Sequence, residues 1–327
     1  MRAEGPYFDE LEKGQVFDSA PSVTLTDGLS ALHQSVVGDR LRLPLDYGLS
    51  AAVTGAPGLA HPALVWDVAI GQSTVVTHHV KANLFYRGLV FRRTPHLGDT
   101  LTTTTTVEGL RQNRRRPDRA STGLVALRIH TVDQHGRDVL DFWRCAMLPL
   151  RTDGDTGHAD DLDRIGSGSD ANWIAAVDDW DSAALTSGMP SAVPDAGEQV
   201  EVIGGDVVDA APQLARISLN VAQVHHDEHA AGGRRLVYGG HTIGIAMSQA
   251  SRAFPGLVTV LGWHGCDHVG PVYEGDTVRS VIAVEKVDAA ATGARLVHLR
   301  SEVFARGGSV PEGERRVLDW RYVALFA

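Results

Sequence analysis

The chain has 327 residues, of which 43% are hydrophobic and 21% charged, and its formal net charge is −10. This composition is ordinary for a globular protein with a large core, and the acidic balance argues against a nucleic-acid groove, which needs a basic stripe. The N-terminal stretch MRAEGPYFDELEKGQ lacks an apolar signal segment, and no run approaches the roughly 18 apolar residues of a membrane span. We therefore expect a cytoplasmic protein that binds neither nucleic acid nor membrane.

The length favours two domains of roughly 150 residues. The two cysteines, Cys145 and Cys266, give neither a disulfide framework nor the paired spacing of a thiolate metal site. They fit a reducing compartment, in agreement with the cytoplasmic prediction.

The first half, residues 1–150, contains an apolar segment followed by long strand-like runs. The segment LAHPALVWDVAIGQS begins at Leu59, and the runs are TLTTTTTVEGL, GLVALRIHTVD and VLDFWRCAMLPL. Threonine, valine and aromatic residues favour strands, and the glycines and Asp-Gly pairs between them favour turns. This order predicts one central helical segment and an antiparallel sheet.

Residues 151–197 differ in composition from the rest of the chain. They are rich in Asp, Gly, Ser and Ala, as in RTDGDTGHADDLDRIGSGSD, and only NWIAAVDDW has a periodic pattern. We predict a linker with one short helix.

The second half, residues 198–327, repeats the order of the first. GHTIGIAMSQASRAF places Ile243, Met247 and Ala250 at helical spacing. The runs TVRSVIAVEKV, ARLVHLRSEVFA and RRVLDWRYVALFA then predict strands.

Three segments recur in the two halves in the same order. PHLGDTL at 95–101 returns as PVYEGDTV at 271–278, VLDFWRCAML at 139–148 returns as VLDWRYVALF at 317–326, and LAHPALVWDVAIGQS matches LVYGGHTIGIAMSQA in its apolar pattern. The shift is about 177 residues each time. We predict an α+β fold of two copies, in which each sheet wraps its own helix and the copies pair sheet to sheet.

The stretch LNVAQVHHDEHA at 219–230 contains three histidines, an aspartate and a glutamate within five residues. A metal site there would combine histidines and aspartates from this stretch with those of WHGCDH: His225, His226, Asp227, His229, His264, Asp267 and His268. The His-Glu-x-x-His signature of zinc enzymes is absent, however, and the stretch has no helical period. The sequence therefore favours an acid/base site without metal, and a solvated loop is the plain alternative.

Several motifs resemble those of the MaoC-like, R-specific enoyl-CoA hydratases and dehydratases. They are QVHHDEH, RRLVYGGHTIGIA and GDTV in the second half, with NLFYRG, GDTL and GLRQN in the first. Within this family they are most similar to the mesaconyl-CoA hydratase branch, also called β-methylmalyl-CoA dehydratase. The resemblance covers nearly the whole chain apart from the linker and implies a double hot-dog fold. It also implies a hydro-lyase that adds water reversibly to a short branched or dicarboxylic enoyl-CoA such as mesaconyl-CoA, with no cofactor besides the coenzyme A of the substrate.

The resemblance also assigns roles in the histidine-rich stretch. R-specific hydratases carry an Asp, an Asn-Pro pair two residues later and a His five residues after the Asp; here these positions hold Asn220, Ala222 with Gln223, and His225. His225 is then the acid/base residue and Asn220 orients the water. In the first copy Asp39 takes the acid position but Pro44 replaces the histidine, which implies that this copy has lost its site and supplies packing and part of the acyl-CoA groove.

Gly239 and Gly240 stand where a loop becomes a helix. Without Cβ atoms their backbone N–H groups can approach a ligand, so they are candidates for an oxyanion hole at the thioester carbonyl. His241 follows and either contacts the substrate or packs on the helix. A tight loop-to-helix turn alone would also explain the two glycines.

Coenzyme A carries phosphates, which arginine binds well. The candidates for this role are Arg111, Arg114, Arg115 and Arg116 in RQNRRRPDR, with Arg234 and Arg235 before YGGH. An exposed hairpin tip explains the first group equally well.

Other functions stay open at this stage. A related dehydratase would act on another 3-hydroxyacyl thioester. A non-catalytic acyl-CoA-binding or accessory hot-dog protein would explain why one copy lacks the acid and the other the histidine. A thioesterase is a third alternative, because one fold hosts many activities. A further homodimer is compatible with all of them.

Overall fold

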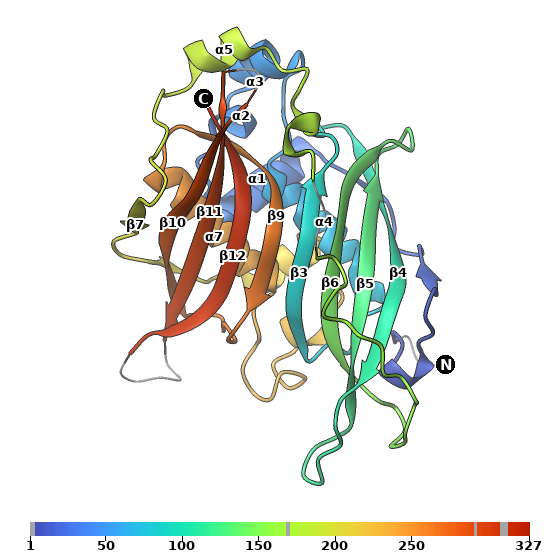
Figure 1. Cartoon of the computed structure of the whole chain (residues 1–327). Helices are drawn as coiled ribbons and strands as arrows, with labels where there is room; N and C mark the ends of the chain where they lie inside the picture. The colour runs from blue at the N-terminus through green and yellow to red at the C-terminus, as the bar shows by residue number, and fades with distance from the viewer. Residues whose placement is uncertain (1–3, 168–170, 291–292, 308–312) are drawn as a thin grey trace.

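An antiparallel sheet of 12 strands runs through the whole molecule (Figure 1). The computed structural model describes residues 4–167, 171–290, 293–307 and 313–327, so residues 168–170 of the predicted linker lie outside it. Within these ranges no helix is long and apolar enough to cross a membrane. Ten strands follow the order β1-β4-β5-β6-β3-β9-β12-β11-β10-β7, while β2 pairs with β4 and β8 with β10 beside this path. Each half of the chain supplies one end of the sheet.

The first half supplies one central helix and a long-stranded sheet. Its main strands are β3 (Ala82–Phe91), β4 (Thr100–Gln112), β5 (Thr122–Val132) and β6 (Asp138–Pro149), and its central helix is α4 (Pro62–Gln72). Every residue of α4 is buried, as expected for a helix that is apolar on all sides. The remaining elements are η1 (Phe8–Glu10), β1 (Val16–Phe17), β2 (Val23–Thr24), α1 (Asp27–Val37), α2 (Arg42–Leu45), α3 (Tyr47–Thr54) and η2 (Ser73–Val75).

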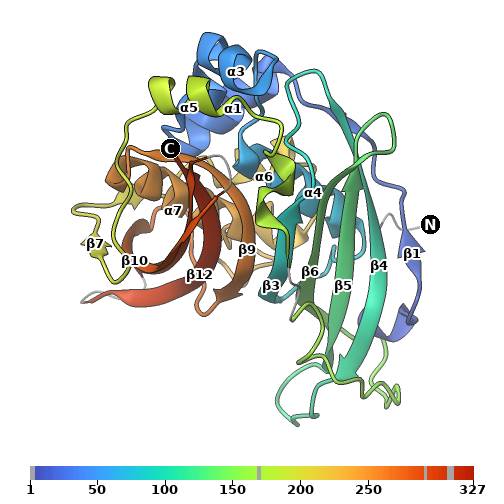
Figure 2. The same ribbon diagram turned by 45° about the horizontal axis from the view of Figure 1, so that its top comes forward.

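The second half repeats this plan. Its central helix is α7 (Gly239–Ala253), and its long strands are β9 (Leu257–His268), β10 (Thr277–Ala289), β11 (Arg295–Arg306) and β12 (Arg315–Phe326). The smaller elements are β7 (Gln199–Glu201), β8 (Asp206–Val207), α6 (Ala211–Ile217) and η4 (Gln223–His225). Figure 2 shows the sheet curving around α4 and α7.

The two halves join edge to edge and not face to face. Strands β3 and β9 pair antiparallel, with Tyr86 opposite Cys266 and Leu89 opposite Trp263. Leu89 and Cys266 lie 177 residues apart, as do Tyr86 and Trp263, so the two pairs are images of one another. The seam is therefore self-complementary, like the interface of a twofold dimer.

Hydrogen bonds inside the halves follow the same twofold relation. Gln72 Nε2 donates to Leu101 O at 3.0 Å, and Gln249 Nε2 donates to Val278 O at 3.0 Å. Both members of the second bond lie 177 residues after those of the first. The repeat predicted from the sequence is thus a repeat in three dimensions.

Aspartates of the repeated motifs hold the fold. In the Gly-Asp-Thr turns, Asp99 accepts a hydrogen bond from the backbone N–H of His96, and Asp276 accepts one from Tyr273. In the last strand of each half, Asp141 pairs with Arg128 and Asp319 with Arg300. These carboxylates fix turns and strand pairs.

The predicted linker is more ordered than its composition suggests. It contains η3 (Trp173–Ala176) inside NWIAAVDDW and also α5 (Ser182–Gly188), which the sequence pattern did not predict. Leu162, Trp180, Leu185 and Met189 are buried. These buried apolar side chains are spaced widely along the chain, but they pack on the folded body, so the segment is anchored to the two halves it joins.

Candidate active site

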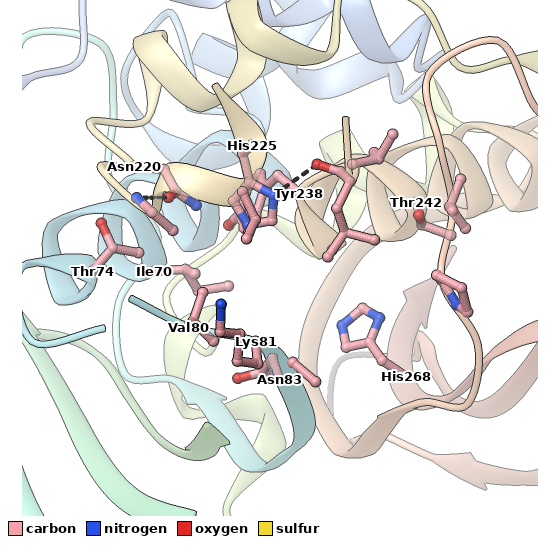
Figure 3. Close-up of a pocket in the computed structure, with 18 of the residues that line it drawn as sticks. Ile70, Thr74, Val80, Lys81, Asn83, Asn220, His225, Tyr238, Thr242 and His268 are labelled. Atoms are coloured by element: carbon pink, nitrogen blue, oxygen red, sulfur yellow. Dashed lines mark hydrogen bonds between the residues drawn. The ribbon is translucent and has the colours of Figure 1, made fainter. Parts of the chain in front are cut away.

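A cavity of about 260 Å³ lies between the two halves of the molecule. Its walls come from the ends of α4 and β3 in the first half, and from η4, the start of α7 and the end of β9 in the second (Figure 3). Its polar lining residues are Thr74, Lys81, Asn83, Tyr86, Arg144, Asn220, His225, Tyr238, Thr242 and His268. Neither half alone would form this site.

His225 lies in the cavity wall with a defined proton arrangement. Its Nδ1 lies 2.9 Å from the carbonyl oxygen of Leu236, so Nδ1 carries the proton and donates it. Nε2 then has a free lone pair. The side chain is 9% exposed, and burial lowers the pKa of His225 to about 4, opposed by the bond to Leu236 and assisted by nearby positive groups. At neutral pH the ring is therefore uncharged and able to accept a proton at Nε2.

Asn220 is buried in the same cavity wall as His225. Its Oδ1 accepts the backbone N–H of Ala222 at 2.9 Å, and its main-chain oxygen lies 2.6 Å from His226 Nε2. Because Oδ1 is engaged by Ala222, the NH₂ group of the amide is the part of the side chain left to bond other groups. The position can donate a hydrogen bond to a water in the cavity but cannot take up a proton.

The structure adds cavity residues that the sequence analysis did not assign to the active site. His268 had appeared only in the metal alternative; its Nε2 is buried without a hydrogen-bond partner among the described residues, and burial lowers its pKa to about 4. Tyr238 donates from its hydroxyl to Asp67 Oδ1 at 3.0 Å. Tyr86 lies in the motif NLFYRG, and its ring meets that of His268 edge-on at 5.8 Å.

The three residues that start α7 occupy different places. Gly239 lines the cavity, and a Cβ there would come within 2.5 Å of the His268 ring. At Gly240 a Cβ would lie 2.2 Å from Asp67. The two glycines are thus required by close packing, and their N–H groups at the helix start lack partners four residues earlier.

His241 does not line the cavity, and its role in the reaction stays a prediction. The ring is buried among the helices with neither nitrogen hydrogen-bonded within the described residues. Burial and the neighbouring His33 lower its pKa to about 4. This burial is compatible with packing on the helix, the second of the two alternatives.

None of the six candidate arginines lines the cavity, and four of them already face carboxylates. Arg111 lies near Asp163, Arg115 near Asp153, Arg234 near Asp276 and Arg235 near Glu274. Arg114 and Arg116 are exposed in the hairpin between β4 and β5. The role of all six arginines in binding phosphate stays a prediction, because arginines at the surface can exchange partners. Among them, Arg235 directly precedes a lining residue, Leu236.

Of the five histidines of the metal alternative, His225 and His268 line the cavity and the other three do not. His226 contacts Asn220, His229 is exposed and His264 lies 2.9 Å from His298. In the described part of the chain, no group of three or more His, Cys, Asp or Glu side chains has the arrangement of a metal site.

The first half contains the counterpart of this site. Asp39 Oδ1 accepts the N–H of Leu41 at 2.7 Å, as Asn220 does for Ala222, and the residues just before them, Gly38 and Leu219, have φ of 66° and 61°. Pro44 stands where His225 would be. His61, the counterpart of Tyr238, places Nε2 3.1 Å from Asp39 Oδ1.

Known proteins resemble the chain over most of its length. It is 54% identical to a conserved hypothetical protein of Mycobacterium tuberculosis described as having a double hotdog fold; the match covers 99% of both chains with a TM-score of 0.93. It is 28% identical over 299 residues to β-methylmalyl-CoA dehydratase of Chloroflexus aurantiacus, covering 84% of this chain and 80% of the relative. It is 25% identical over 319 residues to mesaconyl-CoA hydratase of Cereibacter sphaeroides, covering 93% and 90%. No protein-family model matches the chain. The double hot-dog fold predicted from the sequence is thereby confirmed.

Proposed function

The chain belongs to the MaoC-like hydratase family of hydro-lyases, and from this premise we propose that it hydrates a short branched or dicarboxylic enoyl-CoA, with mesaconyl-CoA the leading candidate. Dehydration or hydration of a coenzyme A thioester is the activity given in the names of the two relatives from Chloroflexus aurantiacus and Cereibacter sphaeroides. For this chain we propose in addition the identity of the acyl group. Coenzyme A takes part as a portion of the substrate, and we propose no separate cofactor.

Water addition to an unsaturated thioester needs a base for the water, a proton for the α-carbon and a partner for the developing enolate oxygen. The neutral His225 ring supplies the base at Nε2, because its Nδ1 proton is held by Leu236. After taking the proton from water, the same imidazolium donates it to the α-carbon. One residue therefore serves both proton transfers.

Asn220 holds the water in place. Its Oδ1 is engaged by Ala222, so its NH₂ donates to the water oxygen and leaves a lone pair of that oxygen directed at the double bond. Without an acid at this position, the proton chemistry falls on His225. Orientation of this kind lowers the barrier by holding the reacting atoms near their attack geometry.

The thioester oxygen is placed at the start of α7. The N–H groups of Gly239 and Gly240 have no earlier carbonyl to bond in the helix, and the positive helix end favours developing negative charge. An oxygen held there gains most as it becomes an enolate.

The cavity size supports a short acyl chain. Its volume of about 260 Å³ lies below the roughly 300–1,000 Å³ common for drug-sized ligands. A four- or five-carbon acyl group fits this space better than a long fatty chain.

The neutral His225 with its free Nε2 in a cavity built by both halves is the observation that carries the proposal. The test is a panel of enoyl-CoA thioesters, followed by mass spectrometry for water addition and by ultraviolet loss of the conjugated thioester. His225→Ala is expected to lower the rate by roughly 10²–10⁴-fold. His229→Ala, an exposed histidine of the same loop, is the matched control and should retain wild-type turnover.

Other results would point elsewhere. Wild-type-like turnover in His225→Ala contradicts the assigned mechanism. Binding of coenzyme A thioesters without water addition across the panel would favour an accessory protein, and release of free thiol would favour a thioesterase.

A further inference from the structure

Arg144 is a buried cation in the cavity wall. It lies on β6 with 3% of its surface exposed. Its Nη1 donates to Ser73 Oγ at 2.9 Å and its Nη2 to Thr77 Oγ1 at 2.8 Å, whereas Nε has no partner among the described residues. In that part of the chain no carboxylate forms an ion pair with it. A guanidinium has five N–H donors, and buried charges are normally paired, so this one is incompletely satisfied.

The fold does not require an arginine at this position. When the repeated strands VLDFWRCAML and VLDWRYVALF are aligned, the counterpart of Arg144 is Tyr322. The counterparts of its two partners, Ser73 and Thr77, are Ala250 and Phe254, which lie 177 residues further on. The cation and both hydroxyl groups that hold it therefore occur together in the half that faces His225, and none of the three occurs in the other half.

The electrostatic character of the cavity agrees with an anionic ligand group. Two lining residues, Lys81 and Arg144, carry a positive charge, and no lining residue is an aspartate or glutamate. Lys81 is exposed at the edge of the cavity, whereas Arg144 is enclosed. Burial is the main cause that lowers the pKa of His225 and of His268, and the positive charge of Arg144 is a smaller cause that acts in the same direction. The charge of Arg144 therefore acts on the part of the cavity that contains His225, the proposed acid/base residue.

We infer that Arg144 binds the carboxylate at the far end of a dicarboxylic acyl group, and so selects substrates that carry a second acid. The inference rests on the proposed hydratase function and names the residue that reads its substrate class. A planar guanidinium pairs with a carboxylate through two parallel hydrogen bonds. Ser73 and Thr77 hold it in position before the substrate enters, which reduces the cost of ordering it on binding.

The first experiment measures binding without turnover. Succinyl-CoA and butyryl-CoA are both saturated four-carbon thioesters, and only succinyl-CoA has a second carboxylate. By calorimetric titration, wild-type protein should bind succinyl-CoA more tightly. Arg144→Met should lose at least about 30-fold in affinity for succinyl-CoA and stay within about threefold for butyryl-CoA. Equal affinity of the wild-type protein for both thioesters would overturn the inference.

Two further variants secure the result. Arg144→Met removes a buried ion, a change that folded proteins often tolerate, and circular dichroism checks its fold. Arg144→Lys keeps the charge but loses the planar fork, so it should bind succinyl-CoA with intermediate affinity and serves if the first variant does not fold. Arg128→Gln, on the neighbouring strand β5 and paired with Asp141, is the control and should leave both affinities unchanged.

The second experiment compares turnover of mesaconyl-CoA and crotonyl-CoA. Arg144→Met should lower kcat/KM for mesaconyl-CoA at least about 30-fold more than for crotonyl-CoA. An equal loss for both substrates would mean that Arg144 stabilises the enolate common to them, and it would overturn the assigned role. If wild-type protein hydrates neither thioester, the proposed function fails, while the saturated pair still tests the carboxylate site.

Discussion

The site around His225 and its counterpart around Asp39 share a backbone but differ in chemistry. In both, a side-chain oxygen accepts the N–H two residues on, and a left-handed residue precedes it. A hydroxyl group from the other half's central helix region also caps the next N–H: Thr74 bonds Val221, and Ser251 bonds Arg40. The shared bonds show what the fold needs at this point.

The differences lie in the side chains that face inward. The second half offers an amide, a free imidazole and a cavity, whereas in the first half Asp39 contacts His61 and a proline replaces the histidine. Burial opposes ionisation of Asp39, but His61 and the N–H of Leu41 outweigh it and lower the pKa of this carboxyl. In the counterpart the carboxylate and the imidazole face one another, whereas in the second half the side chain of His225 faces the cavity.

The first half also supports the site in the second half. Asp67 of α4 accepts the hydroxyl of Tyr238, a cavity residue, and lies 3.1 Å from His33 Nε2. A half that lacks a counterpart of His225 therefore still positions a side chain of the cavity.

Acid is expected to have the largest effect, because it acts on three buried histidines at once. The pKa values of His225, His241 and His268 are each lowered to about 4, from an ordinary value of about 6.5. Between about pH 4 and pH 6.5, these histidines are protonated in the unfolded chain but neutral in the folded chain. The free energy of unfolding should then be unaffected above pH 6.5 and fall by about 1.4 kcal/mol per pH unit and per histidine down to pH 4.

Urea unfolding at several pH values measures this slope. His241→Leu, which copies the leucine at its counterpart position 64, should reduce the slope without altering the cavity lining. An unchanged slope in this variant would mean that His241 is not held neutral by burial.

Asn220→Ala is expected to have the next largest effect. Loss of the group that orients water should lower kcat about 100-fold. Asn220→Asp gives the second half the residue of the first half and preserves the bond to Ala222, so it should fold and turn over faster than Asn220→Ala. Steady-state rates for both variants decide the role; equal rates in wild type and Asn220→Ala would contradict it.

Asp39→Asn is expected to affect stability and not turnover. The amide oxygen can still accept from Leu41, but the charge that faces His61 is lost, at a cost of about 1–3 kcal/mol. Thermal unfolding measures the change, and the hydratase assay is the control. A large loss of activity in a folded variant would place Asp39 in the working site after all.

The smallest effect is expected at the two left-handed residues. Leu219 has φ of 61° and its counterpart Gly38 has φ of 66°, a region that costs a side chain roughly 1–2 kcal/mol. Leu219→Gly should therefore stabilise slightly, and Gly38→Ala should destabilise by about 1 kcal/mol. Chemical unfolding of the two variants should show changes in the free energy of unfolding that have opposite signs. Changes of the same sign would mean that the two local geometries differ.

The repeat made most of the fold predictable from the sequence. A constant shift between copies fixed which segments correspond, and α7 covers the predicted positions Ile243, Met247 and Ala250. The edge pairing of β3 with β9 was not predictable, because either exposed edge of a sheet can accept a partner. The packed linker was missed because its buried residues are few and irregularly spaced.

The site was predictable only where a local motif marked it. His225 and Asn220 lie five residues apart in one loop, whereas Tyr238 meets Asp67 across 171 residues, and no spacing rule reports such a contact. Arg144 did leave a signal. On β6 it shares the inward-facing parity of Leu140, Phe142, Ala146 and Leu148, and a charge among those positions marks a buried cation.

The self-complementary seam between β3 and β9 has a consequence for how the protein responds to dilution. A cavity shared by two separate subunits is lost when they dissociate, so its occupancy depends on protein concentration. Here both contributors belong to one polypeptide, and their effective concentration is set by the connecting segment. In a homodimer each substitution appears in both subunits, whereas in this single chain it appears in one half only. Arg144 therefore places a buried charge in one half, while the hydrophobic core of the other half has Tyr322 at the corresponding position.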